Sequence, residues 1–117
     1  MLKSKPKIEF LDKQNTIRFG GIFIIKSYWE EDEKLVQTVK NFIGDRDKLL
    51  LEFAIFYLDS VSRKIFFELF IEIKEELLKV KKLKIKWYYD SEDESILELG
   101  EVISKILDIP FEFINKD

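Results

Sequence analysis

The segment around Ser60 carries the residue types best suited to chemistry in this chain. Asp59 precedes the Ser60 hydroxyl, and Arg63 and Lys64 follow it about one helical turn later. A phosphate on Ser60 would carry about −1.5 to −2 charges beside a helix N-terminus, which favours anions, and the two basic side chains could pair with it. The structural alternative is that Asp59 or Ser60 only caps a helix. The two interpretations are compatible, because an exposed capping hydroxyl can also be modified.

Composition excludes most other catalytic chemistry. The 117 residues include no Cys and no His, which excludes thiol nucleophiles, disulfides, zinc–cysteine clusters and histidine general bases. An enzyme would have to rely on a carboxylate pair such as Asp90 with Glu94, and no glycine-rich nucleotide loop accompanies that pair. We therefore expect a protein that is not an enzyme and that holds no cofactor and no metal.

The net charge argues against nucleic acid as a partner, and the lack of a long apolar run argues against a membrane location. The formal net charge is −3, whereas nucleic-acid-binding domains are usually basic. The basic run at residues 79–86 is explained by cations at a helix end and by a strand with one polar face. No apolar run approaches the roughly 18 residues of a membrane span, and the first seven residues lack a signal-peptide core. We expect a cytoplasmic protein.

Hydrophobic periodicity predicts five strands and three helices. The strands are expected at residues 7–11, 16–26, 48–57, 83–89 and 111–114. The helices are expected from the acidic cluster 30–33 to Gly44, from Val61 to Lys79, and from the acidic segment 90–95 to a stop at 108–110. Gly20 and Gly21 suggest a β-bulge in the second strand. The third strand is almost entirely apolar, which predicts that helices cover both of its faces.

The resulting order, β-β-α-β-α-β-α-β, predicts an α/β fold. We expect one domain over residues 1–117, with three helices and a mixed, mostly parallel sheet of about five strands. Right-handed crossovers would make the second, third and fourth strands parallel, so that all three end at one edge of the sheet. The segments at that edge are residues 27–29, 59–62 and 89–93. Because open α/β sheets gather function at the carboxyl ends of their strands, we expect a functional surface there.

The candidate partner-binding residues belong mainly to these segments. They are Tyr28, Trp29, Tyr88, Tyr89, Asp90, Glu92 and Asp93. Phe67 is a further candidate, because with Ile71 and Leu78 it forms a second apolar stripe on the long helix. That stripe is either buried beside the core or exposed as a partner or homodimer surface.

The acidic segment 90–95 has three interpretations. Solvated acids at a helix start are the ordinary one, and an electrostatic contact with a basic partner is the functional one. An EF-hand loop would place Ser95 where the sharp turn needs Gly. We therefore do not expect calcium binding.

Two segments resemble signatures of the SiaC family of bacterial regulatory phosphoproteins. Residues 57–64 (YLDSVSRK) look like the phosphosite segment of that family, and residues 86–101 (KWYYDSEDESILELGE) look like its second signature. Residues 111–114 (FEFI) match the usual ending. Residues 27–31 (SYWEE) are similar to the family's Ser-Tyr-Pro-Glu-Asn, with Trp in place of Pro. The similarity covers most of the chain.

The resemblance implies a STAS-like domain, similar to anti-sigma-factor antagonists, that works as a phospho-switch adaptor. Ser60 would be the phosphoacceptor for a partner kinase, and a phosphatase would reverse the modification. The residues around the acceptor would be Asp59, Ser62, Arg63 and Lys64. The unmodified form would bind and activate a diguanylate cyclase in a cyclic-di-GMP pathway that regulates biofilms.

The chain departs from the family pattern at the acceptor itself. Asp59 replaces Asn, Ser60 replaces Thr and Val61 replaces Ser. Serine keeps the hydroxyl chemistry, whereas Asp59 adds a negative charge next to it. The alternative function is therefore a constitutive interaction module of the same fold that has lost phospho-regulation.

Overall fold

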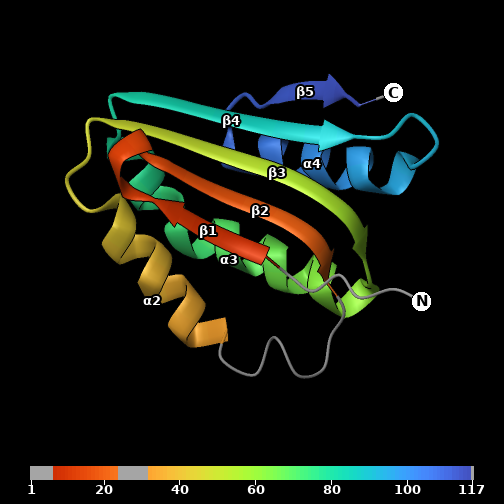
Figure 1. Cartoon of the computed structure of the whole chain (residues 1–117), viewed down its shortest axis with the longest axis horizontal. Helices are drawn as coiled ribbons and strands as arrows, with labels where there is room; N and C mark the ends of the chain where they lie inside the picture. The colour runs from red at the N-terminus through yellow and green to blue at the C-terminus, as the bar shows by residue number, and fades with distance from the viewer. Residues whose placement is uncertain (1–6, 24–31, 117) are drawn as a thin grey trace.

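The computed structural model describes residues 7–23 and 32–116, and Figure 1 shows their arrangement. Five strands lie in these ranges: β1 (Lys7–Leu11), β2 (Thr16–Phe23), β3 (Lys48–Leu58), β4 (Lys82–Tyr89) and β5 (Glu112–Asn115). A short 3-10 helix, η1 (Asp12–Gln14), joins β1 to β2, and the α-helices are α2 (Asp32–Ile43), α3 (Ser60–Lys79) and α4 (Glu94–Leu107). The predicted order of strands and helices is confirmed.

The strands form one sheet in the order β1-β2-β3-β4-β5. β1 runs antiparallel to β2, whereas the pairs β2–β3, β3–β4 and β4–β5 are parallel. The predicted mixed, mostly parallel sheet is therefore confirmed. The register shifts between Gly21 and Ile22, and Gly21 has a φ of 90°. This is the bulge that the two adjacent glycines predicted.

Aspartate caps fix where α3 and α4 begin. Asp59 Oδ1 accepts a hydrogen bond from the backbone N–H of Ser62 at 2.8 Å, and Asp93 Oδ1 accepts one from that of Ile96 at 3.3 Å. Asp is among the best residues at this position, because its carboxylate satisfies an N–H group that has no partner within the helix. As a result α3 begins at Ser60, one residue before the expected start.

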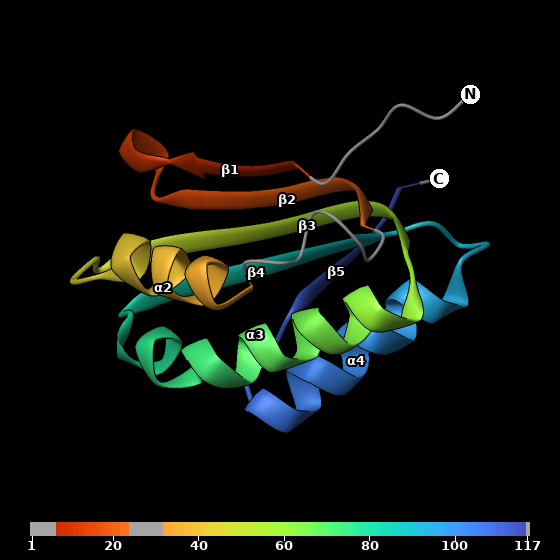
Figure 2. The ribbon, with the colours of Figure 1, turned by 90° about the horizontal axis from the view of Figure 1, so that it is seen from below.

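All three α-helices pack on the same face of the sheet, and the opposite face is open (Figure 2). β3 accordingly alternates: its buried side chains include Leu51 and Phe53, whereas Phe56 on the open face is 66% exposed. The expectation that helices cover both faces of β3 was therefore wrong. The reason is topological. Right-handed crossovers that always step to the next strand in the same direction keep every helix on one side, and a reversal of strand order is needed to reach the other.

Aromatic rings fill the layer between the sheet and the helices. The Phe53 ring stacks on Phe19, with centroids 4.4 Å apart, and lies 5.1 Å from the Trp87 ring. Trp87 is buried, and its Nε1 donates to the backbone oxygen of Ile96 at 2.9 Å. Gly100 lies against the same indole, so that an added Cβ would be 2.7 Å from Nε1. Trp87 thus fixes the height and position of α4 over β4.

A row of alternating charges crosses the open face of the sheet. It consists of one residue from each strand, in register: Glu9, Arg18, Glu52, Lys86 and Glu112. Arg18 Nε lies 2.8 Å from Glu52 Oε1, and Arg18 Nη1 lies 3.7 Å from Glu9 Oε1. The hydrogen bond to Glu52, and then the charge of Glu52, raise the pKa of Arg18. Opposite charges on adjacent strands stabilise a sheet face that remains in water.

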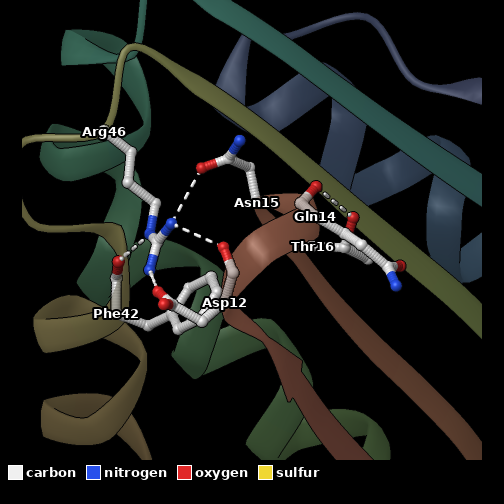
Figure 3. A network of polar contacts seen from close by, with 6 residues as sticks. All are labelled: Asp12, Gln14, Asn15, Thr16, Phe42 and Arg46. Atoms are coloured by element: carbon white, nitrogen blue, oxygen red, sulfur yellow. Dashed lines mark hydrogen bonds and ion pairs between the residues drawn. The ribbon is translucent and has the colours of Figure 1, made fainter.

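Arg46 links the segments that precede β2 and β3 through hydrogen bonds and an ion pair, as Figure 3 shows. Its guanidinium donates to Asn15 Oδ1 at 2.8 Å and to the backbone oxygen of Phe42 at 2.6 Å, and it pairs with the Asp12 carboxylate. Its Cζ also lies 4.0 Å from the centroid of the Phe42 ring. This network stands at the end of the sheet opposite the carboxyl ends of the parallel strands, and it holds the hairpin turn against the turn before β3.

Candidate functional site

The segments that follow β3 and β4 lie on one rim of the molecule. The two strands are parallel, with Phe53 opposite Trp87, so that they end on the same side. The helices that begin there, α3 and α4, contact each other and run in the same general direction (Figure 2). We call residues 59–63 and 89–96 the rim. The third expected segment, with Tyr28 and Trp29, lies outside the described residues.

Ser60 is the first residue of α3 and is exposed. The cap of this helix is made by the Asp59 carboxylate, which accepts from the backbone N–H of Ser62. The Ser60 hydroxyl is therefore left out of the cap. Of the two capping alternatives, the structure assigns the role to Asp59, and the hydroxyl that the sequence singled out stays accessible at a helix N-terminus.

Ser62 has the opposite environment from Ser60. It is completely buried, and its Oγ has no hydrogen-bond partner among the described residues. A kinase cannot reach a hydroxyl that is sealed under the first turn of α3. Of the two serines in this turn, only Ser60 is exposed.

Arg63 joins the two halves of the rim. Its Nη2 donates to Ser95 Oγ at 2.7 Å, and its Nη1 donates to the backbone oxygen of Ser95 at 3.3 Å. Ser95 Oγ in turn donates to Asp93 Oδ1 at 2.7 Å, the same oxygen that caps α4. A chain of hydrogen bonds therefore runs from the first turn of α3 to the start of α4. Lys64, by contrast, is exposed.

The acidic loop closes as a tight turn. The backbone N–H of Asp93 donates to the Asp90 carbonyl at 2.8 Å, and the N–H of Glu92 donates to Asp90 Oδ1 at 3.0 Å. α4 begins at Glu94, so Glu98 and Glu101 are helical and an EF-hand loop cannot form. No group of three or more carboxylates that could hold a metal ion occurs in residues 7–23 and 32–116.

A small hollow lies between the acidic loop and the end of β3. Its volume is about 240 Å³, and its lining includes Phe56, Asp90, Glu92, Asp93 and Lys116. Lys116 Nζ lies 4.8 Å from the centroid of the exposed Phe56 ring, close enough for a cation–π contact. Sequence analysis missed Phe56, because within the apolar run of β3 it looked like a core residue. An exposed aromatic ring beside carboxylates suits a partner surface.

The two tyrosines of β4 lie on opposite faces of the sheet. Tyr89 packs against the core, whereas Tyr88 shares the open face with Lys86. Both are half-buried. The structure therefore does not bring the two side chains together, although both stand at the carboxyl end of the strand.

Phe67 belongs to a different feature from the acidic loop. It is half-buried and packs against the core, and it lines a groove of about 690 Å³ between α2 and α3. Ile71 and Leu78 are 46% and 59% exposed. The second stripe of the long helix is thus partly buried at Phe67 and exposed further along.

Ser95 is the rim residue that sequence analysis passed over as a potential contact. Its only sequence signal is its place two residues after the capping Asp93. Its hydrogen-bond partner, Arg63, lies 32 positions earlier.

In the described part of the chain, no helix is long and apolar enough to cross a membrane.

Comparisons with known proteins identify the family of the chain and support its fold. The model of the SiaC family regulatory phosphoproteins matches residues 2–116. The chain is similar to a crystal structure of diguanylate cyclase SiaD in complex with its activator SiaC from Pseudomonas aeruginosa, with 20% identity, a TM-score of 0.78, and coverage of 98% of this chain and 95% of that one.

A crystal structure of apo-SiaC from the same organism has 20% identity and a TM-score of 0.76, over 97% of this chain and 93% of that one. At this identity the likeness establishes the fold. No curated protein sequence matches the chain. The family model covers nearly the whole sequence and includes both signature segments, and the chain therefore belongs to the SiaC family of regulatory phosphoproteins.

Proposed function

We propose that this chain is a phospho-switched adaptor without a catalytic site of its own, acting as one regulatory domain in the cytoplasm. The unmodified form binds a signalling enzyme through the rim. A partner kinase phosphorylates Ser60 and releases that enzyme, and a phosphatase restores binding. The observation that carries this proposal is the exposed Ser60 hydroxyl, left out of the helix cap, on the same rim as the acidic loop.

A diguanylate cyclase is the partner that we propose. SiaC from P. aeruginosa, which shares this fold, is described as the activator of the diguanylate cyclase SiaD. The surface that would bind the cyclase comprises Tyr28, Trp29, Tyr88, Tyr89, Asp90, Glu92 and Asp93. Phe56 joins this surface because it is exposed beside the acidic loop. Phe67, which lines the separate groove between α2 and α3, is a candidate for a second contact.

The physical basis of release is the cost of burying a dianion. A phosphate adds about −1.5 to −2 charges next to Asp59 and near the acidic loop. The N-terminus of α3 favours an anion, so the phosphorylated protein stays folded. A partner that packs against the neutral hydroxyl would have to remove water from the phosphate, which is unfavourable without a matching cation.

The test is phosphorylation and cyclase binding measured on the same protein. The chain is incubated with ATP and protein kinases from the same organism, and the modified residue is located by mass spectrometry. Binding to a diguanylate cyclase from the same organism is then compared for wild type, Ser60→Ala, Ser60→Asp and the buried control Ser62→Ala. We expect modification at Ser60 alone, loss of binding on phosphorylation and with Ser60→Asp, and full binding by Ser60→Ala and Ser62→Ala.

An unmodified Ser60, together with normal cyclase binding by Ser60→Asp, would overturn the switch. The constitutive interaction module is then the better function, and one observation favours it: Asp59 places a permanent carboxylate beside the hydroxyl. In cells with an active kinase, that alternative predicts that wild type and Ser60→Ala capture equal amounts of the cyclase. The switch predicts that Ser60→Ala captures more.

A further inference from the structure

We propose that Arg63 is a relay between the phosphate and the acidic loop. In the unmodified protein it holds Ser95, and on phosphorylation of Ser60 its guanidinium turns to the phosphate and releases the start of α4. This inference rests on the proposed function, because it takes Ser60 as the acceptor. It adds the route by which a modification on α3 reaches the carboxylates after β4.

The bridge in the unmodified protein depends on one side chain. Arg63 contributes both hydrogen bonds to Ser95, at 2.7 Å to Oγ and 3.3 Å to the backbone oxygen. Ser95 Oγ then donates to Asp93 Oδ1 at 2.7 Å. Arg63 is partly buried between the two helices. These hydrogen bonds form a polar link between α3 and the acidic loop.

A phosphate on Ser60 would compete directly for this guanidinium. Ser60 and Arg63 are three residues apart on α3, and side chains at that spacing are neighbours on a helix surface. Long side chains on a helix generally lean back toward its N-terminus, which favours an approach of Arg63 to Ser60. Both acceptors on Ser95 are neutral, whereas a phosphate offers charged oxygens that bind a guanidinium in a bidentate manner. Charge-assisted bonds of this kind are about twice as strong as neutral ones.

Loss of the bridge changes the loop and leaves the helix in place. Asp93 would still cap α4 through the N–H of Ile96, and Trp87 would still hold the helix through the backbone oxygen of the same residue. The turn that carries Asp90 and Glu92 would lose its tether to α3. The partner surface would thus become less ordered at the moment when the phosphate makes it more negative.

Amide hydrogen exchange tests the relay without the kinase or the cyclase. Phosphoserine is incorporated at position 60 of the full chain by genetic encoding, and exchange is followed at the amides of Glu92 and Asp93, with the Ile96 amide as an internal reference because its bond to Asp93 should persist. The amides of Glu92 and Asp93 make the hydrogen bonds that close the loop. We expect severalfold faster exchange in the phosphorylated protein, and a similar increase in unphosphorylated Ser95→Ala.

Variants of the two neighbouring cations identify the relay. In Arg63→Gln the loop is already untethered, so exchange is fast before modification and the phosphate adds nothing. Lys64→Gln is the matched control: it removes an exposed cation that holds neither helix, and the effect of the phosphate should persist. Cooperative thermal unfolding of each variant shows that faster exchange does not come from a failure to fold.

Two results would overturn the relay. One is unchanged exchange at Glu92 and Asp93 in the phosphoserine protein or in Ser95→Ala. The other is loss of the effect in Lys64→Gln with its retention in Arg63→Gln, which would make Lys64 the phosphate ligand. Either result leaves release by burial of a dianion intact. Conversely, a kinase that ignores Ser60 would overturn the proposed function while this exchange experiment remains interpretable.

Discussion

At the scale of single residues, the first turn of α3 divides its tasks among three neighbours. Asp59 makes the cap, Ser60 presents a free hydroxyl, and Ser62 is buried. A hydroxyl at the start of a helix often makes the cap, but here the Asp59 carboxylate takes that role. Stability and modification are therefore carried by different side chains and can be changed separately.

Removing the cap should cost stability, whereas removing the acceptor should not. Asp59→Ala leaves the N–H of Ser62 without its partner, and we expect a loss of about 1 kcal/mol in the free energy of unfolding. Asp59→Asn keeps a good cap, and Ser60→Ala changes an exposed side chain, so both should stay within about 0.5 kcal/mol of wild type. Urea denaturation measures all three. Equal losses in Ser60→Ala and Asp59→Ala would mean that the hydroxyl takes part in the cap.

The buried Ser62 hydroxyl should be dispensable for folding. Its Oγ has no partner among the described residues, so burying it costs free energy that no hydrogen bond returns. Ser62→Ala should therefore leave the free energy of unfolding unchanged or raise it by about 1 kcal/mol. A clear loss of stability in chemical denaturation would show that the hydroxyl has a partner, such as a buried water.

At the scale of elements, the placement of α4 depends on close contact between a glycine and an indole. The Trp87 ring occupies the space that a side chain at position 100 would need. Because the acidic loop leads directly into α4, the same contact also sets where the loop stands relative to β4. A residue one helical turn beyond the rim thus controls the geometry of the candidate site.

Gly100→Ala should destabilise the protein although alanine is the better helix former. Its Cβ would lie 2.7 Å from Trp87 Nε1, so the helix or the indole must move. We expect a net loss of about 1–3 kcal/mol from overpacking, after the gain in helix propensity of about 1 kcal/mol. Gly20→Ala is the matched control, because its nearest atom would be the Ala54 oxygen at 3.5 Å, an ordinary contact. Thermal unfolding should separate the two variants by several degrees.

At the scale of the whole molecule, the protein is a two-layer structure with helices on one side of its sheet (Figure 2). Among the described residues no helix covers the open side, and the charged row makes that face compatible with water. Glu52 stands at its centre, with Arg18 on one neighbouring strand and Lys86 on the other. The stability of that face should therefore depend on electrostatics.

Arg18→Met should weaken the sheet more than Lys84→Met. The substitution removes a short hydrogen bond from the Glu52 carboxylate, whose side chain is only 14% exposed. We therefore expect a loss of about 1 kcal/mol in the free energy of unfolding. Lys84 and Glu112 are 63% and 50% exposed and 3.9 Å apart, a pair worth little in water. Urea denaturation at low and high salt compares the two. Equal effects of both substitutions would contradict the central role of Arg18.

The sequence by itself determined what depends on near neighbours. Alternation and helical spacing predicted the order of elements, the paired glycines predicted the bulge, and the parallel crossovers brought the Ser60 and Asp90 segments to one edge. These features follow from side-chain period, capping and chain handedness, which act over a few residues or one crossover.

Only the tertiary structure decided what depends on residues far apart in the chain. That all helices share one face follows from strand order, which the apolar run of β3 does not encode, and Phe56 is exposed for the same reason. The bond between Arg63 and Ser95 joins positions 32 apart and exists because α3 and α4 pack side by side. Contacts of this kind depend on how whole helices and strands pack, so no local sequence pattern predicts them.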